Sequence, residues 1–562
     1  MHGWKGTLLS PNDLQGHPTN AEPVGRRRLI RRSLLGRVVT GLAAVLVLAV
    51  LVAPTETGHL QPAGFLRVPV EALLGAALVL ALPARPRRWV AGVLGVALGA
   101  LAVVKVIDVG FFAVLDRSFD PLLDWGFLEA GVVFLTSSMG RPAALGAVAG
   151  AVVGALVVLT LVALSVRRLA GVAVRHQARA RPVVAILTVV WAVCAVSGVQ
   201  IVPQVPVAAH VTVDRLAQMR AGLADSETFA AQMIMDPFGA TPPSSLLTAL
   251  RGKDVVIAFV ESYGRTAIEH PSLAAELGPR LDDGTDRLRA AGFESRSAYL
   301  TSPTAGGGSW LAQITLLSGL WVDNQHRYQA LLATDRLTLT GAFQRAGWRT
   351  VGVMPGVILD WPEGSFFDYD RIYAAKDLGY RGPNFSFATM PDQYTLSAFE
   401  RLERARADRP PLMAVIPLIS SHAPWNPVPP SVDWSDVGDG SGYGAVPGAG
   451  DPADVVLGRD PARVRADYAH AIGYTIDTVV SYVETYGDGD LVVVLLGDHQ
   501  PAPVITGEGA SRDAPITVIT RDPAVLARIA EWGWSSGLNP GPAAPVWRMD
   551  AFRDRFLTAF GR

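Results

Sequence analysis

The sequence of 562 residues carries 49 basic and 50 acidic side chains, and a formal net charge of −1 gives no reason to expect a nucleic-acid partner. Half of the residues are hydrophobic, and the mean hydropathy of +0.29 is high for a soluble protein. The length exceeds that of an ordinary single domain. The single cysteine, Cys194, excludes an intrachain disulfide and a four-cysteine zinc site, and it is expected to face the core or lipid.

Five apolar stretches occupy the first third of the chain. Each is close to the roughly 20 residues that a helix needs to cross the hydrocarbon core of a bilayer. They cover residues 38–54, 66–83, 89–115, 143–165 and 183–201. We therefore predict a basic cytoplasmic N-terminus over residues 1–37 and a transmembrane domain of five helices over residues 38–201.

Arginine clusters alternate with loops that hold few positive charges. The clusters lie at residues 26–37, 84–88 and 166–181, and the poorly charged loops at residues 55–65 and 116–142. The positive-inside rule then places the N-terminus in the cytoplasm and the chain beyond the fifth span outside the plasma membrane. A cleaved signal peptide is the alternative for the first stretch, but the residues before it and the four later spans argue against that reading.

Two ionisable residues interrupt the third predicted span. Lys105 and Asp108 lie three positions apart, so they share a helix face and can pair. They form either part of a lipid-headgroup pocket or a structural ion pair near the outer interface. The stretch from Gly110 to Leu128 mixes aromatic and acidic residues, as expected of an interfacial loop rather than a sixth span.

The pattern changes after residue 250, where short β-rich runs alternate with helix-like segments. The runs are residues 254–260, 349–354, 412–418, 491–496 and 515–520, and the helix-like segments include 339–347 and 468–486. This alternation predicts an α/β domain over residues 251–562 with a mostly parallel central sheet covered on both faces. Residues 202–250 are predicted to be a linker, and the glycine-rich residues 436–452 a surface loop.

Ionisable side chains follow two of the predicted strands. Glu261 comes directly after the first strand, and Asp498 and His499 follow the strand at 491–496. Sites form where parallel strands end, at the carboxyl edge of the sheet. Two close carboxylates need a cation or a shared proton, and an added imidazole favours Zn²⁺ or Mn²⁺ over Ca²⁺. The alternative is that Glu261 caps a helix and that the other two residues belong to a turn.

A candidate nucleophile follows the three glycines at positions 306–308. Ser309 opens a helical pattern that continues with Trp310, and a hydroxyl at a helix start lies near free N–H groups that hold a phosphate well. The alternative is that Ser309 is only a helix N-cap. His422 follows the strand at 412–418, so it reaches the same edge and can bind a phosphoryl oxygen or protonate a leaving group. A purely structural role is the alternative for this histidine.

Four motifs carry a family resemblance: IAFVESYG, the glycine-rich stretch ending at Ser309, SSHAPW and VVLLGDH. In this order they resemble the alkaline phosphatase/sulfatase superfamily, and in particular its membrane-bound lipoteichoic acid synthase-type phosphotransferases. The resemblance implies five N-terminal spans, a linker and an extracellular sulfatase-like catalytic domain. It implies Glu261, Ser309, Asp498 and His499 as ligands of one divalent ion (Mn²⁺, Zn²⁺ or Mg²⁺), with Ser309 also the nucleophile. His422 matches the family's substrate-binding histidine.

The sequence departs from this family in two places. The synthases usually have Thr at the position of Ser309, and their histidine-bearing segment after the middle strand reads MPGVILDW here. Asp360, Trp361 and Arg349 are the candidate substitutes in substrate binding. True sulfatases need Cys/Ser-x-Pro-x-Arg, and TSPTA at residues 301–305 lacks both the first residue and the arginine, which disfavours a sulfatase.

Together these features predict a metal-dependent transferase on the outer face of the plasma membrane. It would move a phospho-alcohol group from a lipid headgroup to an envelope polyol, glycan or lipid acceptor through a phospho-serine at Ser309. The expected partners are a lipid-linked donor, an envelope acceptor and the membrane. A phosphodiesterase or sulfuric ester hydrolase of the same fold is the first alternative. A non-catalytic envelope scaffold is the second, and the presence of all four metal and nucleophile residues argues against it.

Overall fold

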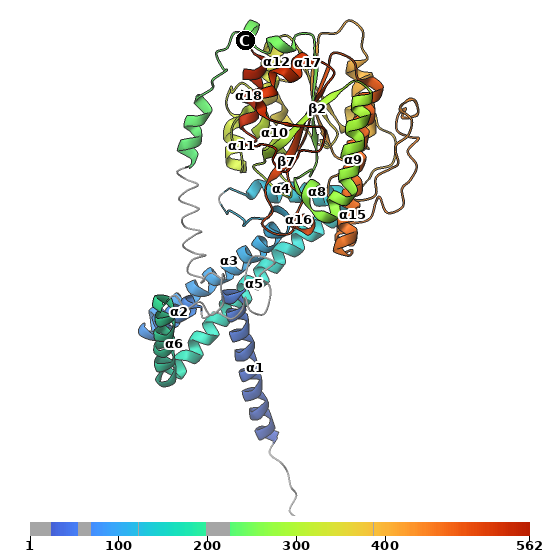
Figure 1. The fold of residues 1–562 in the computed structure, drawn as a ribbon. Coiled ribbons are helices and arrows are strands. Elements are labelled where there is room, and N and C mark those ends of the chain that lie inside the picture. Colours follow the sequence, from blue (N-terminus) through green and yellow to red (C-terminus); the bar gives the residue numbers. More distant parts are fainter. Residues whose placement is uncertain (1–23, 54–68, 122, 198–224, 386, 562) are drawn as a thin grey trace, which may run out of the picture. The chain divides into compact units, whose positions relative to one another are not determined.

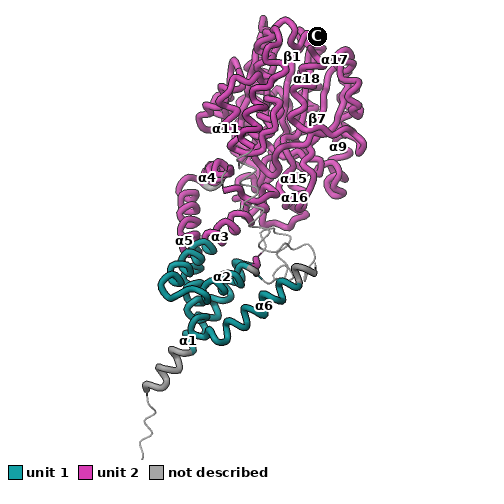
Figure 2. The backbone as a smooth tube through the Cα atoms, turned by 90° about the vertical axis from the view of Figure 1, so that its left-hand side faces the viewer, with its two compact units in different colours: residues 1–51, 69–99, 159–199 teal, residues 52–68, 100–158, 200–562 magenta. Residues whose placement is uncertain are grey.

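The computed structural model describes residues 24–53, 69–121, 123–197, 225–385 and 387–561 (Figure 1). The chain forms two compact units, of which one comprises residues 1–51, 69–99 and 159–199 and the other residues 52–68, 100–158 and 200–562 (Figure 2). The predicted transmembrane domain is thus shared between the two units. Most of the basic N-terminus, the loop at 54–68 and the first part of the predicted linker lie outside the described residues.

The N-terminal third is helical. Its helices are α1 (Val24–Val52), α2 (Val70–Ala81), α3 (Ala84–Leu115), α4 (Trp125–Met139), α5 (Arg141–Arg175) and α6 (Gln177–Ser197). Three helical segments in the described residues are long and apolar enough to cross a membrane: Leu34–Val52, Ala84–Leu115 and Arg141–Arg175. The second predicted span corresponds to the 12-residue helix α2, and the fifth to α6, which contains Pro182. The count of five spans therefore stays a prediction.

The two ionisable residues of α3 each bond to a backbone group outside this helix. Lys105 Nζ donates a hydrogen bond to the carbonyl oxygen of Ala53 at 2.8 Å. The buried Asp108 accepts one from the backbone N–H of Phe119 at 2.9 Å, and this fixes the turn that follows the helix. The predicted pairing of Lys105 with Asp108 stays a prediction.

The described part of the second unit holds a nine-stranded sheet with the strand order β4-β3-β5-β1-β6-β7-β2-β8, and β9 pairs with β2. The strands are β1 (Asp254–Val260), β2 (Glu294–Thr301), β3 (Arg349–Met354), β4 (Arg371–Ala374), β5 (Leu412–Leu418), β6 (Leu491–Gly497), β7 (Asp513–Thr520), β8 (Ser535–Ser536) and β9 (Val546–Arg548). The five strands from β4 to β6 are parallel, whereas β7 is antiparallel to both of its neighbours. The prediction of a mostly parallel sheet is confirmed, and β2, β4, β8 and β9 are additions to it.

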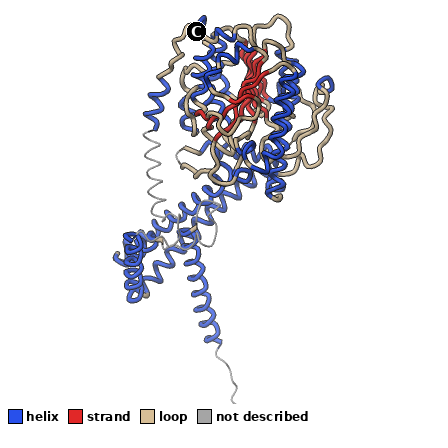
Figure 3. Tube along the Cα trace, viewed as in Figure 1, coloured by secondary structure: helices blue, strands red, loops and turns tan. Residues whose placement is uncertain are grey.

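Helices cover both faces of the sheet, as Figure 3 shows for the red strands. In β1, Val256, Ala258 and Val260 point into one core, and the alternate residues point into the other. The first core packs under α9 (Pro271–Ala290), α13 (Asp392–Phe399) and α15 (Pro461–Tyr486), and the second under α10 (Ser309–Ser318), α12 (Leu339–Arg345) and α18 (Ala551–Phe560). Burial on both faces explains why the central strands are apolar without a break.

The remaining helices are short. They are α8 (Thr266–Glu269), α11 (Gln325–Leu332), α14 (Ala453–Leu457), α16 (Pro503–Thr506) and α17 (Pro523–Arg528). Residues 437–452 contain no helix or strand, as the glycine-rich composition predicts.

The register of the sheet brings several chain segments to one edge. Val260 at the end of β1 pairs with Leu418 of β5 and with Gly497 of β6, so three neighbouring strands end together. Since β7 is antiparallel to both β6 and β2, strand β2 runs in the same direction as β6. The loop after Thr301 therefore leaves the sheet at this edge too, where Thr301 pairs with Asp513.

A buried carboxyl group supports the loop that follows β5. Asp392 at the start of α13 accepts hydrogen bonds from the backbone N–H groups of Ile419 and Ser420, at 2.8 and 3.1 Å, and from Thr475 Oγ1 at 2.7 Å. Burial raises the pKa of Asp392 to about 6, although these hydrogen bonds favour its ionised form. The loop toward His422 thus depends on an acid that is costly to ionise.

This burial predicts a distinct pH dependence of stability. Because the folded pKa of Asp392 lies above its unfolded value, the folded state binds more protons between about pH 4 and 6. The contribution of this group to the free energy of unfolding is therefore largest below about pH 4 and falls as the pH rises through 6, by about 3 kcal/mol in total. We expect the thermal midpoint of the full-length protein, relative to that of Asp392→Asn, to decrease over this window in the presence of a chelator.

The exposed acid Asp282 on α9 provides the control. Asp282→Asn should leave the pH profile of the wild type unchanged. If the difference in thermal midpoint between the wild type and Asp392→Asn is the same at every pH, the pKa of Asp392 is not raised.

Candidate metal centre

Four side chains converge at the carboxyl edge of the sheet. Glu261 follows β1, Asp498 and His499 follow β6, and Ser309 opens α10. His499 Nε2 lies 3.4 Å from Glu261 Oε1 and 3.7 Å from Asp498 Oδ2. Ser309 Oγ donates to Glu261 Oε2 at 2.8 Å and lies 3.2 Å from His499 Nε2. The two carboxylates and the imidazole are buried and offer ligand atoms within 4.8 Å of one another.

Backbone groups fix the orientation of the ligand atoms. Asp498 Oδ1 accepts from the N–H groups of Ser262 at 2.8 Å and of His499 at 2.7 Å, so Oδ2 is the oxygen that faces the imidazole. His499 Nδ1 lies 2.8 Å from the carbonyl oxygen of Gln500. A carbonyl can only accept, so Nδ1 carries the proton and Nε2 presents a lone pair to the cluster.

The ends of the strands are shaped for this arrangement. A Cβ at Gly497 would lie 1.8 Å from the carbonyl oxygen of Tyr263, so only glycine lets the two strand ends approach this closely. Ser262 adopts a left-handed conformation with φ of 58°, which turns its N–H toward Asp498. The hydroxyl of Tyr468 donates to the carbonyl of Ser262, and the hydroxyl of Ser421 donates to that of Glu261.

Ser309 is held over the cluster by the glycine-rich loop. The N–H of Gly306 donates at 2.8 Å to the carbonyl of Gln500, which is also the partner of His499. Gly308 is the N-cap residue of α10, and the hydroxyl of Ser309 faces Glu261 and His499. The neighbouring hydroxyls are engaged elsewhere, since Thr304 donates to the carbonyl of Gly307 and Thr301 to Asp513.

The acid groups of the cluster have opposite pKa shifts. Burial raises the pKa of Asp498 to about 7, and the Glu261 carboxylate adds to this rise. Burial would also raise the pKa of Glu261, but the imidazoles of His422 and His499 and the hydroxyl hydrogen bonds from Ser262 and Ser309 outweigh it and hold this pKa at about 2. For His499, burial alone would lower the pKa, and the two carboxylates raise it instead. Each shift is thus set by burial together with the neighbouring groups of the cluster.

The donor set fits a divalent cation. Two carboxylate oxygens, an imidazole nitrogen and a hydroxyl oxygen face one another, and a positive charge between the two carboxylates would relieve their mutual repulsion. A mixed set of one nitrogen and three oxygens suits Zn²⁺ or Mn²⁺, and Mg²⁺ less well because it binds mainly oxygen. Calcium is disfavoured, because it takes six to eight oxygen ligands.

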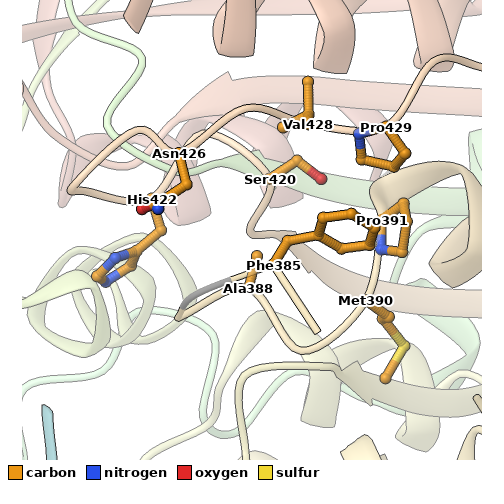
Figure 4. Close-up of a pocket in the computed structure, with 9 residues that line it drawn as sticks. All are labelled: Phe385, Ala388, Met390, Pro391, Ser420, His422, Asn426, Val428 and Pro429. Atoms are coloured by element: carbon orange, nitrogen blue, oxygen red, sulfur yellow. The ribbon is translucent and has the colours of Figure 1, made fainter. Parts of the chain in front are cut away.

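His422 approaches the cluster from the loop after β5. Its charge acts on Glu261, and its Nδ1 lies 2.6 Å from the carbonyl oxygen of Ala423, which leaves Nε2 free to meet a substrate. Its ring stacks on Phe387 with the ring centroids 3.8 Å apart. It also lines a pocket, and Figure 4 shows the ring at one side of it, away from Val428 and Pro429. The full lining is Phe385, Ala388, Met390, Pro391, Ser420, His422, Asn426, Val428 and Pro429.

The three predicted substrate-binding substitutes lie apart from these side chains. Arg349 is the first residue of β3, at the amino end of the strand, and it forms two hydrogen bonds of 2.7 Å with Glu403, which raise its pKa. The side chain of Asp360 is 99% exposed, and Trp361 packs on Phe367. Among the described residues, no hydrogen bond, ion pair or ring contact joins these three to the converging four.

Sequence reasoning missed several supporting residues. Ser262 and Gln500 each lie one position beyond a predicted ligand. Both act through backbone atoms that any residue has, and the hydroxyl of Ser262 also donates to Glu261 Oε1 at 2.9 Å. Asp392 acts from a helix more than 25 residues before the loop it supports. Of these residues, only Gln500 could have been found from the sequence. It directly follows a predicted strand, Asp498 and His499, so it had to lie at the site.

The comparisons with known proteins concern the fold. No family model and no curated protein matches the chain. Similar solved structures include the lipoteichoic acid synthase LtaP from Listeria monocytogenes (15% identity over 48% of this chain and 66% of that chain, TM-score 0.33). Others are the C-terminal periplasmic domain of EcEptC from Escherichia coli (12%, 55% and 82%, TM-score 0.37) and the Streptococcus pyogenes phosphoglycerol transferase GacH in complex with sn-glycerol-1-phosphate (13%, 60% and 91%, TM-score 0.34).

The chain spans just under two thirds of the Listeria structure. The names of these proteins match the superfamily that the sequence motifs resemble. At such identities and TM-scores the likeness carries no argument about the reaction or the substrate of this chain.

We expect the converging side chains to hold one divalent ion. Asp498→Ala and His499→Ala should each lower the metal content of the purified full-length protein by at least tenfold, because the loss of one ligand leaves a weak and asymmetric shell. His422→Ala is the matched control, since His422 lies near the cluster without belonging to it, and it should keep the wild-type metal content. Full metal occupancy in Asp498→Ala would show that the ion binds elsewhere.

Proposed function

We propose that the protein is a metal-dependent transferase that moves a phospho-alcohol group from a lipid headgroup to a polyol, glycan or lipid acceptor of the cell envelope. The observation that carries this proposal is the position of Ser309. Its hydroxyl opens a helix, donates to Glu261 and lies 3.2 Å from His499 Nε2. A hydroxyl used for packing alone would not be held against two ionisable groups.

The chain's own residues account for both halves of a covalent route. Ser309 Oγ loses its proton to solvent and forms a bond to phosphorus. The bond from phosphorus to the lipid alcohol breaks, and the leaving oxygen takes a proton from Nε2 of protonated His422. In the second half, the acceptor hydroxyl attacks the phospho-serine and gives its proton to His422. The bond from phosphorus to Ser309 Oγ breaks, and this oxygen recovers a proton from solvent.

The remaining elements of the site support the same chemistry. The start of α10 points free backbone N–H groups and the positive end of the helix dipole toward the phosphoryl group. A bound divalent ion would lower the pKa of the Ser309 hydroxyl and offset the charge that develops on the phosphoryl oxygens. We propose Glu261, Ser309, Asp498 and His499 as its ligands and Mn²⁺ or Zn²⁺ as the ion, with Mg²⁺ as the third candidate.

A hydrolase of the same fold is the second candidate function. It would use the same serine and the same ligands, with water in place of the acceptor hydroxyl. A non-catalytic scaffold is disfavoured, because a scaffold has no need of two buried carboxylates, an imidazole and a hydroxyl that converge on one point.

We also propose five spans, a cytoplasmic N-terminus and an extracellular catalytic domain over residues 251–562. Any odd number of crossings, whether the three that the helices support or five, separates the N-terminus from this domain. Protease added to intact cells should therefore degrade the region around Asp498 and spare a tag at the N-terminus. Protection of both regions would overturn the orientation.

We expect Ser309→Ala to lower turnover of an aryl phosphodiester such as bis(4-nitrophenyl) phosphate by several orders of magnitude, because a covalent route has no substitute for its nucleophile. The variant should unfold at nearly the wild-type temperature. Mass spectrometry of the quenched wild-type enzyme should find the phospho-adduct on the peptide that contains Ser309. Thr304→Ser is the control for the neighbouring hydroxyl and should keep most of the activity.

Two results would reopen the choice of nucleophile. One is an active Ser309→Ala enzyme, and the other is an adduct on Thr301 or Thr304. Product analysis then separates transfer from hydrolysis: with a polyol such as glycerol present, a transferase forms the new diester, whereas a hydrolase releases only the monoester.

A further inference from the structure

A helix from the membrane-associated third of the chain lies against the catalytic residues. The ring of Phe127 in α4 contacts that of Trp310, with centroids 5.3 Å apart, and Trp310 is the neighbour of Ser309. Further along α4, the ring of Phe134 lies 6.4 Å from that of His422 and 5.8 Å from that of Phe387. One side of α4 therefore reaches both the nucleophile helix and the loop of the candidate acid.

The end of α3 packs on the glycine-rich loop itself. A Cβ at Gly306 would lie 1.5 Å from the carbonyl oxygen of Val114, and one at Gly307 would lie 3.4 Å from the side chain of Leu115. The glycine at position 306 is thus needed for the approach of a second backbone, in addition to its φ of 71°. The loop that positions the nucleophile rests directly on the end of an apolar helix.

The turn between α3 and α4 is held by its own contacts. Arg117 forms two hydrogen bonds to the buried Asp124, at 2.6 and 2.8 Å, and its guanidinium lies over the ring of Phe127. Asp116 accepts a hydrogen bond from the N–H of Gly509 in the loop that follows α16. We call residues 111–121 and 123–134 the α3–α4 corner, and these contacts show that it packs as part of the unit that contains Ser309.

The chain itself places α4 at a membrane boundary. Only Gly140 separates its end at Met139 from the start of α5, whose apolar run begins at about residue 143. Both α3 and α5 are long and apolar enough to cross a membrane, whereas the 15 residues of α4 are too few, at roughly 1.5 Å per residue, to do so. If α3 and α5 cross the membrane, α4 connects the ends of two spans on one side of the bilayer.

The outer face of α4 suits that surface. Trp125 is 62% exposed and Val132 37% exposed, and they share this face with the exposed Glu129. The indole N–H of Trp125 donates to the carbonyl of Pro121, so its ring can enter lipid without leaving a donor unpaired. Tryptophan and a nearby charge on one face are typical of a helix at headgroup level.

We propose that the α3–α4 corner is the membrane-facing wall of the catalytic site. In this arrangement the outer face of α4 lies on the bilayer, its inner face touches the nucleophile helix and the His422 loop, and a phospholipid presents its phosphate to Ser309 without leaving the membrane. Phe134 is a positioning residue that acts through the ring of His422. This inference rests on the proposed function for the identity of the donor, but the contact with lipid is independent of it.

The test is depth-dependent quenching in vesicles of phosphatidylcholine and phosphatidylglycerol. In full-length Cys194→Ser protein, Trp125→Cys and Val132→Cys are each labelled with a fluorophore, and doxyl-labelled phosphatidylcholine is added. Asp490→Cys is the control, since it precedes β6 at the opposite edge of the sheet and its side chain is 67% exposed. We expect at least threefold stronger quenching at positions 125 and 132 than at 490. Equal quenching at all three positions would overturn the inference.

Activity separates this inference from the proposed function. Val132→Asp, which adds a charge to the lipid face, should lower diacylglycerol release from vesicles of phosphatidylglycerol and phosphatidylethanolamine at least tenfold. It should leave cleavage of bis(4-nitrophenyl) phosphate in detergent within twofold of the wild type, and Glu129→Gln should leave both rates unchanged. A wild-type protein that cleaves the aryl diester but releases no diacylglycerol would overturn the membrane route. A metal-loaded wild type that cleaves neither substrate would instead refute the proposed function, while the quenching result still decides whether α4 lies on lipid.

Discussion

The mutual repulsion of buried ligand atoms is the constraint on which the candidate site depends. Glu261, Asp498 and His499 leave neighbouring parallel strands at the same height, because β1 and β6 are paired in register up to their last residues. The apolar strands behind them gain their stability from burial on both faces, and this burial holds the charged ends together against their electrostatic preference. A cation or a shared proton would relieve the repulsion between the two carboxylates. The pairing of β1 with β6 therefore also determines what this edge of the sheet can bind.

A single backbone carbonyl couples the two halves of this edge. The oxygen of Gln500 accepts from His499 Nδ1 and from the N–H of Gly306, both at 2.8 Å. The first bond fixes the tautomer that turns Nε2 toward the cluster, and the second holds the loop that carries Ser309. A shift of this carbonyl would therefore disturb the candidate ligand His499 and the candidate nucleophile Ser309 at once. Its identity as a backbone atom explains why no side-chain pattern in the sequence marks it.

Strands and site residues could be predicted from the sequence where a local residue pattern marks them. They could not be predicted where their position depends on pairing with a distant segment. The central strands could be predicted because burial on both faces leaves an unbroken apolar run, and their last residues located Glu261 and Asp498. Strand β2 could not be predicted, because its sequence is partly polar like that of a loop, and it becomes a strand through its pairing with the distant β7. Arg349 is a second example. A side chain can reach the site only from the carboxyl end of its strand, whereas Arg349 lies at the amino end of β3 and pairs with Glu403.

The glycines before Ser309 show how one local signal can have two physical causes. From the sequence they predict a sharp turn and close backbone approach at the nucleophile. The partner in that approach is the carbonyl of Val114, some 190 residues earlier, at the end of an apolar helix that can cross a membrane. Any side chain at Gly306 would have to displace that backbone, so the loop geometry at the nucleophile and the packing of α3 cannot vary independently. The end of α3 therefore packs on the loop that carries Ser309, and residues 100–158 belong to the same compact unit as the predicted catalytic domain over residues 251–562.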